Sequence, residues 1–385
     1  MKIGIDARCF LGGRKSGVEE YTYQVIKNVL KRDKKNQYVL FLNSAKDFQL
    51  SWSWLKDFDN VKIKKFRWPN KLLNFFFWYL NWPKIDKMLG GVDIFWAPNW
   101  NFWGLSRKVK FVLTVHDLSF EYYPETFSWK RRWWHFFVNP RRAVKRADKI
   151  IAISRSTYDD LVNFYHVPKE KIKIIHSGIK DDYQVLNRND LKLIEIKEKY
   201  RLPFNFIFFL GTLEPRKNIV GIVKAYEELR RENHPELDKY KLVIAGNPGW
   251  KMQKIFQVVS QSVFRRDILF IGPVAEKDKV YLYNLATVFV FPSLLEGFGF
   301  PPLEALKSGT PVIVSSNSSF PETVGRAGIM IDPDRFSEIK EAMRTLLLKR
   351  ELRESFQVEG LRQAQKFSWS KTAQEYLKVW QNLAG

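Results

Sequence analysis

The sequence predicts an α/β protein built from two mainly parallel sheets. Short runs of β-branched and aromatic residues alternate with longer amphipathic stretches, which is typical of βα units. The pattern restarts in the second half of the chain, after a joint near Gly178 to Asp190. A chain of 385 residues, at roughly 150 residues per domain, predicts two to three domains.

The first half contains seven predicted strands, with helical patterns between several of them. These strands are Lys2 to Asp6, Tyr38 to Leu42, Val61 to Phe66, Ile94 to Ala97, Lys110 to Val115, Lys149 to Ala152 and Lys173 to Ile175. The first predicted helix covers Glu20 to Leu30. Parallel strands with helical crossovers place loops and helix starts at the carboxyl edge of the sheet, where ligands bind.

The second half repeats the scheme with six predicted strands. They are Phe206 to Leu210, Lys241 to Ala245, Ile268 to Ile271, Val288 to Phe291, Pro311 to Ser315 and Gly328 to Ile331. A final helix is predicted from Lys371 to Leu383, after Phe367-Ser368-Trp369.

The composition excludes several classes of protein and points to an anionic partner. Hydrophobic residues make up 45% and charged residues 27%, which excludes collagen-like, disulfide-scaffold and largely disordered chains. The net charge of +23 attracts polyanions such as nucleic acid, anionic lipid or phosphorylated substrates. The 14 Trp and 31 Phe favour a membrane surface over nucleic acid.

The sequence favours a cytoplasmic protein. We expect no secretory leader and no membrane-spanning helix, because no stretch approaches 18 unbroken apolar residues. The single cysteine, Cys9, cannot form an internal disulfide, which fits a reducing compartment.

A glycine-rich segment follows the first strand. Gly12, Gly13 and Gly17 stand between that strand and the first helix, so the backbone can approach an anion closely. The segment matches neither the dinucleotide fingerprint nor a P-loop, and an ordinary turn explains it equally well.

A histidine follows the strand that ends at Val115. His116 can hydrogen-bond a substrate hydroxyl, and Asp117 beside it can bias its tautomer; the alternative is a structural histidine. The other histidines show no metal-ligand spacing, so we expect no metal site.

Two adjacent cations follow the strand Phe206 to Leu210. In the run 214–218, Glu-Pro-Arg-Lys-Asn, Arg216 and Lys217 arrive at a helix start, where a guanidinium and an ammonium make a diphosphate clamp. The alternative is two solvated surface cations.

Two carboxylates stand eight positions apart after the strand Val288 to Phe291. Glu296 lies in a glycine-containing loop, and Glu304 falls near the first turn of a helix that Pro301 and Pro302 can start. Such a loop can present carboxylates and backbone N–H groups to a sugar nucleotide. Helix capping by Glu304 and a solvated Glu296 remain open alternatives.

Together these motifs resemble the retaining glycosyltransferases of family 4, which have the GT-B architecture. The resemblance rests on the Glu-x7-Glu pair from Glu296 to Glu304, the run 214–218, His116-Asp117-Leu118 and the N-terminal glycine segment. It implies two Rossmann-like domains facing an interdomain cleft. It also implies that 1–180 binds the acceptor, 181–366 binds the nucleotide sugar, and 367–385 is a helix that crosses back to the N-terminal domain.

The resemblance also implies roles for individual residues. Arg216 and Lys217 would bind the donor diphosphate, Glu296 the transferred sugar and Glu304 the ribose, while His116 would contact the sugar at the reaction centre. His116, Glu296, Arg216 and Lys217 form the catalytic set. The remaining implied donor-binding residues are Gly12, Gly13, Val274, Gly297, Phe298 and Gly299. Neither a cofactor nor a metal is implied.

The expected activity is transfer of a hexose, with mannose the leading choice, from a GDP- or UDP-linked donor to a glycan or lipid-linked acceptor in surface polysaccharide or glycolipid assembly. Two alternatives remain: a nucleotide-sugar epimerase or hydrolase on the same scaffold, and a non-catalytic polyanion-binding protein. No nucleic-acid-binding signature is present, so nucleic acid is not an expected partner.

Two aromatic segments of the first half suggest where the protein meets a membrane. Residues 68–82 are too short and interrupted to span a bilayer but suit its interface. Residues 129–146 mix Trp and Phe with Lys and Arg, which favours an anionic leaflet. We therefore expect peripheral association with the inner face of the cytoplasmic membrane; the alternative is a buried helix at 68–82 and a solvated cationic face.

Overall fold

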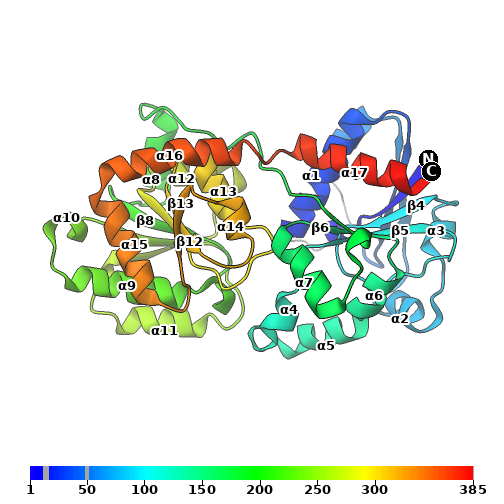
Figure 1. Ribbon diagram of the computed structural model, residues 1–385, viewed down its shortest axis with the longest axis horizontal. Helices are drawn as coiled ribbons and strands as arrows, with labels where there is room; N and C mark the ends of the chain where they lie inside the picture. The colour runs from blue at the N-terminus through cyan, green and yellow to red at the C-terminus, as the bar shows by residue number, and fades with distance from the viewer. Residues whose placement is uncertain (12–16, 48–51, 385) are drawn as a thin grey trace. The chain divides into compact units, whose positions relative to one another are not determined.

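The computed structural model describes residues 1–11, 17–47 and 52–384 (Figure 1). The chain divides into two compact units. Unit 1 comprises Met1–Pro124, Trp129–Gly178 and Ser368–Gly385, and unit 2 comprises Glu125–Ser128 and Ile179–Phe367. The boundaries predicted from the sequence lie after residues 180 and 366, and this prediction includes 125–128 in the first domain.

Unit 1 contains a seven-stranded parallel sheet with the order β3-β2-β1-β4-β5-β6-β7. Its strands are β1 (Lys2–Asp6), β2 (Gln37–Asn43), β3 (Val61–Phe66), β4 (Ile94–Ala97), β5 (Lys110–Val115), β6 (Lys149–Ala152) and β7 (Ile172–Ile174). The order turns back between β1 and β4, which makes their carboxyl ends the switch point where Rossmann-like sheets bind ligands.

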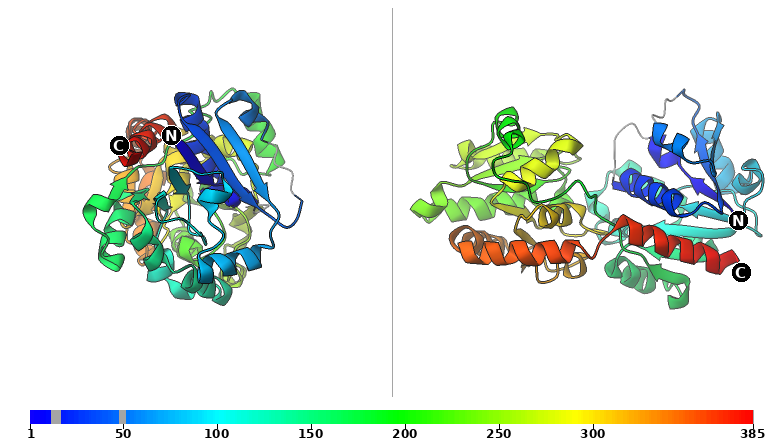
Figure 2. Two further views of the ribbon diagram at one scale, coloured as in Figure 1. Left: turned by 90° about the vertical axis from the view of Figure 1, so that its right-hand side faces the viewer. Right: turned by 90° about the horizontal axis from the view of Figure 1, so that it is seen from above.

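One face of this sheet is covered by α1 (Gly17–Arg32) and α17 (Trp369–Ala384), which lie side by side (Figure 2). The two helices share a buried hydroxyl network with the sheet. The Tyr376 hydroxyl lies 2.7 Å from that of Tyr21 and 2.6 Å from that of Thr114. Gly178 permits the chain to pass the start of α17, because a Cβ there would lie 2.0 Å from the Trp369 nitrogen.

The other face of the unit 1 sheet packs against the remaining helices through a core that includes Phe95, Phe111 and Leu113. These helices are α2 (Asn70–Leu80), α3 (Ile85–Met88), α4 (Ser119–Tyr122), α5 (Trp129–Val138), α6 (Pro140–Arg146) and α7 (Arg155–Tyr165). In the part of the chain that the structure describes, no helix has the length and apolarity needed to cross a bilayer.

The segment 68–82 forms a helix at the protein surface. α2 buries Leu73 and Phe77, whereas Phe75, Trp78 and Tyr79 are exposed. The alternative of an ordinary buried helix is therefore wrong, because only one stripe of α2 packs on the sheet.

Unit 2 contains a six-stranded parallel sheet with the order β10-β9-β8-β11-β12-β13. Its strands are β8 (Phe206–Leu210), β9 (Lys241–Ala245), β10 (Ile268–Gly272), β11 (Val288–Phe291), β12 (Val312–Ser315) and β13 (Gly328–Ile331). The switch point of this sheet lies between β8 and β11. The predicted pair of Rossmann-like parallel sheets is thus confirmed, and a cleft between them stays a prediction.

Nine helices of the described residues surround the sheet of unit 2. They are α8 (Leu191–Lys199), α9 (Ile219–Arg231), α10 (Pro235–Asp238), α11 (Gln253–Gln261), α12 (Lys279–Leu285), α13 (Phe300–Lys307), α14 (Phe320–Thr323), α15 (Phe336–Leu348) and α16 (Arg350–Ala364).

Candidate active site

The loops that follow β8 and β11 carry the charged cluster of unit 2. After β8, a 3-10 turn (Pro215–Lys217) leads to Asn218, which begins α9. Asn218 has a positive φ of 53°, and its side chain accepts a hydrogen bond from the Gly221 nitrogen at 3.2 Å. This cap fixes the turn, so Arg216 and Lys217 are held at the helix start.

Arg216 and Lys217 both reach the loop after β11. Lys217 Nζ donates a hydrogen bond to Glu296 Oε1. Arg216 Nη1 donates to the Leu295 carbonyl at 2.6 Å and lies 3.8 Å from Glu296 Oε2. The side chains of Lys217, Glu296 and Arg216 are only 9%, 12% and 15% exposed, so the alternatives of solvated surface cations and a solvated Glu296 are wrong.

Two further side chains complete the cluster, and the sequence analysis assigned a role to neither. Glu214 is buried. Its Oε1 accepts a hydrogen bond from Arg216 Nε at 3.2 Å and is ion-paired with Arg216 Nη2 at 3.1 Å. The buried Ser293 hydroxyl donates to Glu296 Oε1 at 2.7 Å. The sequence held a signal for each: Glu214 precedes the two cations in the same run, and Ser293 is the second residue after the end of β11.

The electrostatics of the cluster keep Glu296 ionised. Burial by itself would raise the pKa of this carboxyl, but Lys217 and Arg216 together hold its pKa below the ordinary value. Two cations thus balance two carboxylates. An ammonium has three donors. Within the described residues Lys217 donates to Glu296 alone, which leaves two donors for an anionic ligand.

Glu304 belongs to a second group of polar side chains in unit 2. It is the fifth residue of α13 and lies directly after the first helical turn, close to its predicted position near that turn. Its Oε2 accepts a hydrogen bond from the buried Tyr283 hydroxyl at 2.9 Å. Burial and the nearby Glu304 raise the pKa of Tyr283 well above its ordinary value, so this phenol remains a donor.

Glu304 does not cap α13, which excludes the alternative role that the sequence left open. The helix begins after Gly299, whose φ of 83° favours glycine and whose position receives no side-chain cap. A Cβ at Gly299 would also lie 2.9 Å from the Phe320 ring.

The other implied donor-binding residues of unit 2 lie in loops at the carboxyl ends of strands. Gly297, Phe298 and Gly299 connect β11 to α13. The Phe298 ring is buried against Phe300 and Phe367, so only its backbone remains for a ligand. Val274 is half-buried in the loop after β10.

In unit 1, His116 follows β5 and lies beside the loop after β4. Its Nε2 lies 2.8 Å from the Pro98 carbonyl, and the ring meets Tyr21 edge-on at 4.8 Å. A carbonyl only accepts, so Nε2 carries the proton and Nδ1 is left as an acceptor. Burial lowers the pKa of His116, which keeps the ring neutral, although Pro98 and Asp117 act in the opposite direction.

The predicted role of Asp117 as the group that sets the tautomer of His116 is therefore corrected. Asp117 Oδ1 accepts from the Ser119 nitrogen at 2.9 Å and from the Ser119 hydroxyl at 2.6 Å, which forms a turn at the start of α4. Gly12 and Gly13 lie outside the described residues. Among the described residues, no group of three or more His, Cys, Asp or Glu side chains is placed to hold a metal ion.

The fold and the cluster together define a class of protein: a two-unit Rossmann-like chain with paired cations and carboxylates at one switch point. Comparison with protein families specifies it further. Residues 15–183 match the model of Glycosyltransferase Family 4, and residues 194–363 match that of Glycosyl transferases group 1.

Individual relatives and solved structures agree with these matches. O-antigen chain mannosyltransferase B of Escherichia coli is 31% identical over 288 residues, 74% of this chain and 73% of the relative. The serotype-specific mannosyltransferase WbdA of Escherichia coli is 33% identical over 268 residues, 69% of this chain but only 32% of that longer relative. HepE from Anabaena, solved with UDP and glucose, has a TM-score of 0.75 at 17% identity, over 99% of this chain and all of that one. WaaG, a glycosyltransferase involved in lipopolysaccharide biosynthesis, has a TM-score of 0.72 at 15% identity, over 98% of this chain and 99% of that one.

The chain belongs to the family 4 glycosyltransferases. This finding confirms the family resemblance drawn from the motifs, and the two solved structures confirm the GT-B fold.

Proposed function

We propose that the protein transfers a mannosyl group from a nucleoside-diphosphate mannose to a glycan or lipid-linked acceptor in surface polysaccharide assembly, with retention of the anomeric configuration. The two Escherichia coli relatives are both named as mannosyltransferases, one of them for O-antigen chains. Family membership also favours transfer over the epimerase, hydrolase and polyanion-binding alternatives.

The observation that carries the proposal is the contact between Lys217 and Glu296 at the switch point of unit 2, with Arg216 beside them. A diphosphate leaving group gains negative charge as the bond to the sugar breaks. Arg216 and Lys217 stand fixed before this charge develops, so they stabilise the transition state without reorganisation. Glu296 and Glu214 hold the two cations in place.

The proposed reaction breaks the bond between the sugar C1 and the diphosphate oxygen and forms a bond between C1 and the acceptor oxygen. In attack on the same face, the leaving phosphate accepts the proton of the acceptor hydroxyl, and no protein base is needed. A covalent intermediate is the alternative route to retention. On either route, Nδ1 of the neutral His116 can accept a hydrogen bond from a sugar hydroxyl.

We further propose that GDP-mannose is the donor and that no metal is required. The support for metal independence is the cation pair itself, which supplies the positive charge that a divalent ion would provide in other transferases. Glu304 would bind the ribose diol through the carboxylate that Tyr283 orients.

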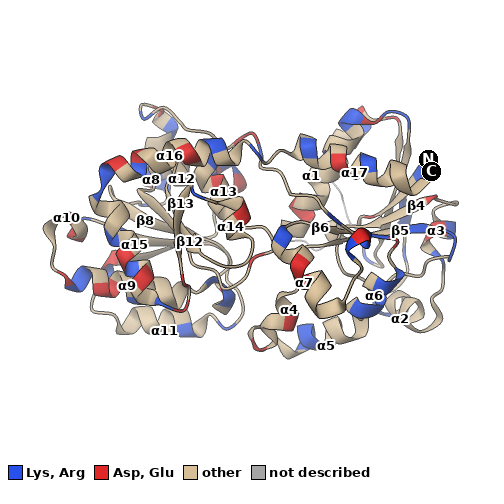
Figure 3. Cartoon of the chain, in the orientation of Figure 1, with Lys and Arg blue, Asp and Glu red and all other residues tan. Residues whose placement is uncertain are grey.

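Association with an anionic membrane on the cytoplasmic side completes the proposal. Exposed rings from α2, α5 and Trp82 form what we call the α2–α5 aromatic face: Phe75, Trp78, Tyr79, Trp82, Trp129, Trp133, Trp134, Phe136 and Phe137. The ring centroids of Trp78 and Phe137 lie 5.6 Å apart, and this edge-on contact joins α2 to α5. α5 and α6 also carry Lys and Arg residues (Figure 3). Indole rings and cations together suit an anionic headgroup layer.

The test is a transfer assay with radiolabelled GDP-mannose, an excess of EDTA and a mannose-terminated acceptor glycan carried on a lipid. We expect EDTA-resistant transfer and an α-linked product by NMR, because GDP-mannose is an α-glycoside. Transfer from UDP-glucose alone would contradict the choice of donor. A β-linked mannoside would refute retention, and release of free mannose without transfer would indicate a hydrolase.

A further inference from the structure

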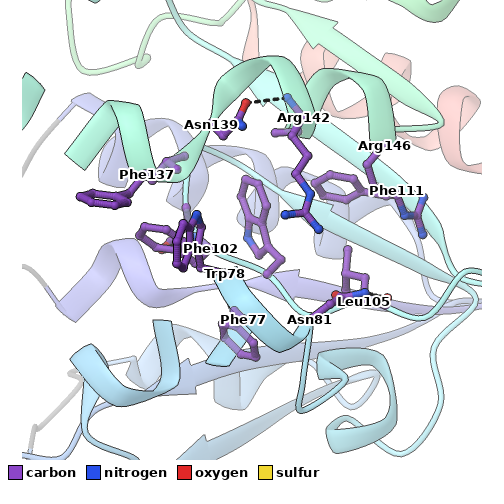
Figure 4. A pocket seen from close by; sticks show the side chains of 14 residues that line it. Phe77, Trp78, Asn81, Phe102, Leu105, Phe111, Phe137, Asn139, Arg142 and Arg146 are labelled. Carbon is purple, nitrogen blue, oxygen red and sulfur yellow. Dashed lines mark hydrogen bonds between the residues drawn. The ribbon is translucent and has the colours of Figure 1, made fainter. Parts of the chain in front are cut away.

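Unit 1 contains a pocket next to the α2–α5 aromatic face. It has a volume of about 150 Å³ and lies between α2, the 101–105 loop and the junction of α5 and α6 (Figure 4). Phe77, Leu105, Phe111 and Ala143 line it with buried apolar surface. A dry cavity of about 150 Å³ accommodates a benzene-sized group, so this pocket has room for about six carbon atoms.

Polar contacts behind the pocket fix its wall. The Trp103 indole donates to Asp6 Oδ2 at 2.8 Å, and Arg8, paired with the same carboxylate at 2.7 Å, donates to the Phe102 carbonyl at 2.9 Å. Asn81 Oδ1 accepts from the Leu105 nitrogen at 3.0 Å. The 101–105 loop is therefore anchored to the carboxyl end of β1 and to the end of α2.

Two arginines line the pocket, and they differ in their partners. Arg146 is paired with Asp148 at 3.1 Å and donates to the carbonyls of Ser106 and Val109. The Arg142 side chain forms no hydrogen bond or ion pair with any residue that the structure describes, and its guanidinium points over the pocket (Figure 4). An anion can therefore pair with Arg142 without displacing an existing partner.

An apolar pocket beneath an unpaired guanidinium is complementary to an amphiphile with an anionic head. The exposed rings of Trp78 and Phe137 line this pocket and also belong to the α2–α5 aromatic face. Once this face lies in the headgroup layer, the amphiphiles that surround the pocket are the bilayer phospholipids.

We infer that this pocket binds one anionic phospholipid of the bilayer, with its phosphate on Arg142 and about six carbons of one chain among Phe77, Leu105 and Phe111. The inference rests on the membrane association proposed above. It adds a specific lipid site to a surface that would otherwise bind by charge and aromatic area alone.

The test compares flotation with vesicles of phosphatidylcholine, with and without phosphatidylglycerol, for Arg142→Ala and for the matched control Arg141→Ala. Arg141 is the preceding residue with the same charge, but its guanidinium lies over the Tyr165 ring at 5.1 Å. Loss of one non-specific basic residue near an anionic surface weakens binding about fivefold, which we expect for Arg141→Ala. For Arg142→Ala we expect binding to weaken about 10- to 100-fold, because a hydrogen bond to a charged group is lost.

A second variant tests the pocket without a change of charge. Ala143→Leu fills part of the cavity, and we expect it to weaken binding to phosphatidylglycerol vesicles to a similar extent at an unchanged melting temperature. If Ala143→Leu unfolds the protein, the comparison of Arg142→Ala with Arg141→Ala still tests whether the pocket binds a lipid phosphate.

Monomeric dihexanoyl-phosphatidylglycerol separates the lipid site from membrane association. We expect it to raise the melting temperature of the native chain and of Arg141→Ala but not that of Arg142→Ala, and dihexanoyl-phosphatidylcholine to have a smaller effect. If the protein binds the short lipid but not the vesicles, the lipid site in the pocket is supported and the proposed membrane association is refuted.

Several results would overturn the lipid site. Equal weakening by Arg141→Ala and Arg142→Ala would show that only charge matters, and no shift with the short lipid would show that the pocket is empty of phospholipid. A shift with polyprenyl phosphate in place of phosphatidylglycerol would reassign the pocket to a lipid-linked acceptor. These measurements need no sugar donor, so failure of mannosyl transfer leaves their outcome unchanged.

Discussion

Lys217 and Glu296 are paired across the switch point of the unit 2 sheet, from loops that follow the neighbouring strands β8 and β11. Both side chains are largely buried, so water does not solvate either charge. Each charge is compensated by the other, and removal of one leaves an unpaired buried charge. This pair links the stability of unit 2 to the site where we place the leaving group.

The pair predicts that stability and catalysis respond differently to the same substitutions. We expect Lys217→Met and Glu296→Gln each to lower the free energy of unfolding by about 3–5 kcal/mol, because each breaks a buried pair. The double variant should be more stable than either single variant. All three should lose about 10²- to 10³-fold in kcat, as expected when a preorganised charge at a transition state is removed.

Urea denaturation and steady-state kinetics measure the two effects separately. A double variant that regains activity together with stability would mean that the pair serves only the fold. Single variants with native stability would show that the pair is not buried as described.

Glu304 is expected to determine nucleotide affinity. Glu304→Ala should weaken binding of the nucleoside diphosphate about 10- to 100-fold, because a hydrogen bond to a charged group is lost. Tyr283→Phe is the matched control: it removes the contact that orients Glu304 but keeps the carboxylate, and should have a smaller effect. Isothermal titration with GDP measures both, and equal affinities of Glu304→Ala and the native chain would refute the ribose role.

Most strands of both sheets could be predicted from the sequence, because each is a short apolar run with local boundaries. The limits of β1, β3, β4, β5, β6, β8, β9, β11 and β13 match the predicted strands. β2 and β10 are extended by one residue at one end or both, β12 begins one residue later than predicted, and β7 is shifted by one residue toward the N-terminus. The cations and carboxylates of the site could be predicted from the same local pattern, since polar residues that directly follow buried strands gather at one sheet edge.

Contacts between distant segments could not be predicted. The bond from Arg216 to the Leu295 carbonyl depends on how the β8 and β11 loops meet. The helix begins at Phe300, one residue before the two prolines, so Glu304 lies one residue further from the helix start than predicted. Asp117 was misjudged because proximity in sequence to His116 suggested a contact that Ser119 takes instead.

The pH dependence of stability is expected to involve His135 in α5. Burial lowers the pKa of His135 to about 4, and its ring stacks on Phe120 at 4.1 Å. In the unfolded chain the His135 imidazole binds a proton with its ordinary pKa of about 6.5. In the folded protein the same ring binds a proton only near pH 4. The unfolded state therefore binds more protons in this window, and stability falls as the pH drops from about 6.5 toward 4.

His135→Phe tests this dependence because it keeps the aromatic stack and removes the titrating group. Melting temperatures between pH 7.5 and 4.5 should fall less steeply for this variant than for the native chain. Identical slopes would show that other groups cause the acid destabilisation.

The hydroxyl network under α17 is expected to stabilise unit 1. Tyr376→Phe should lower the free energy of unfolding by about 1 kcal/mol, because it removes the hydroxyl that Tyr21 and Thr114 share. A double-mutant cycle with Thr114→Val measures the coupling. Strictly additive effects of the two substitutions would indicate that the shared hydrogen bond contributes nothing.

The central claim is that the cation pair of unit 2 binds a nucleoside diphosphate without a metal. The most direct measurement is a thermal-shift titration in EDTA with GDP, UDP, ADP and dTDP, because a ligand that binds only the folded state raises its melting temperature. We predict the largest rise with GDP, and its loss in Lys217→Met relative to the melting temperature of that variant alone. No rise with any diphosphate in EDTA, or a rise that Lys217→Met retains in full, would contradict the claim.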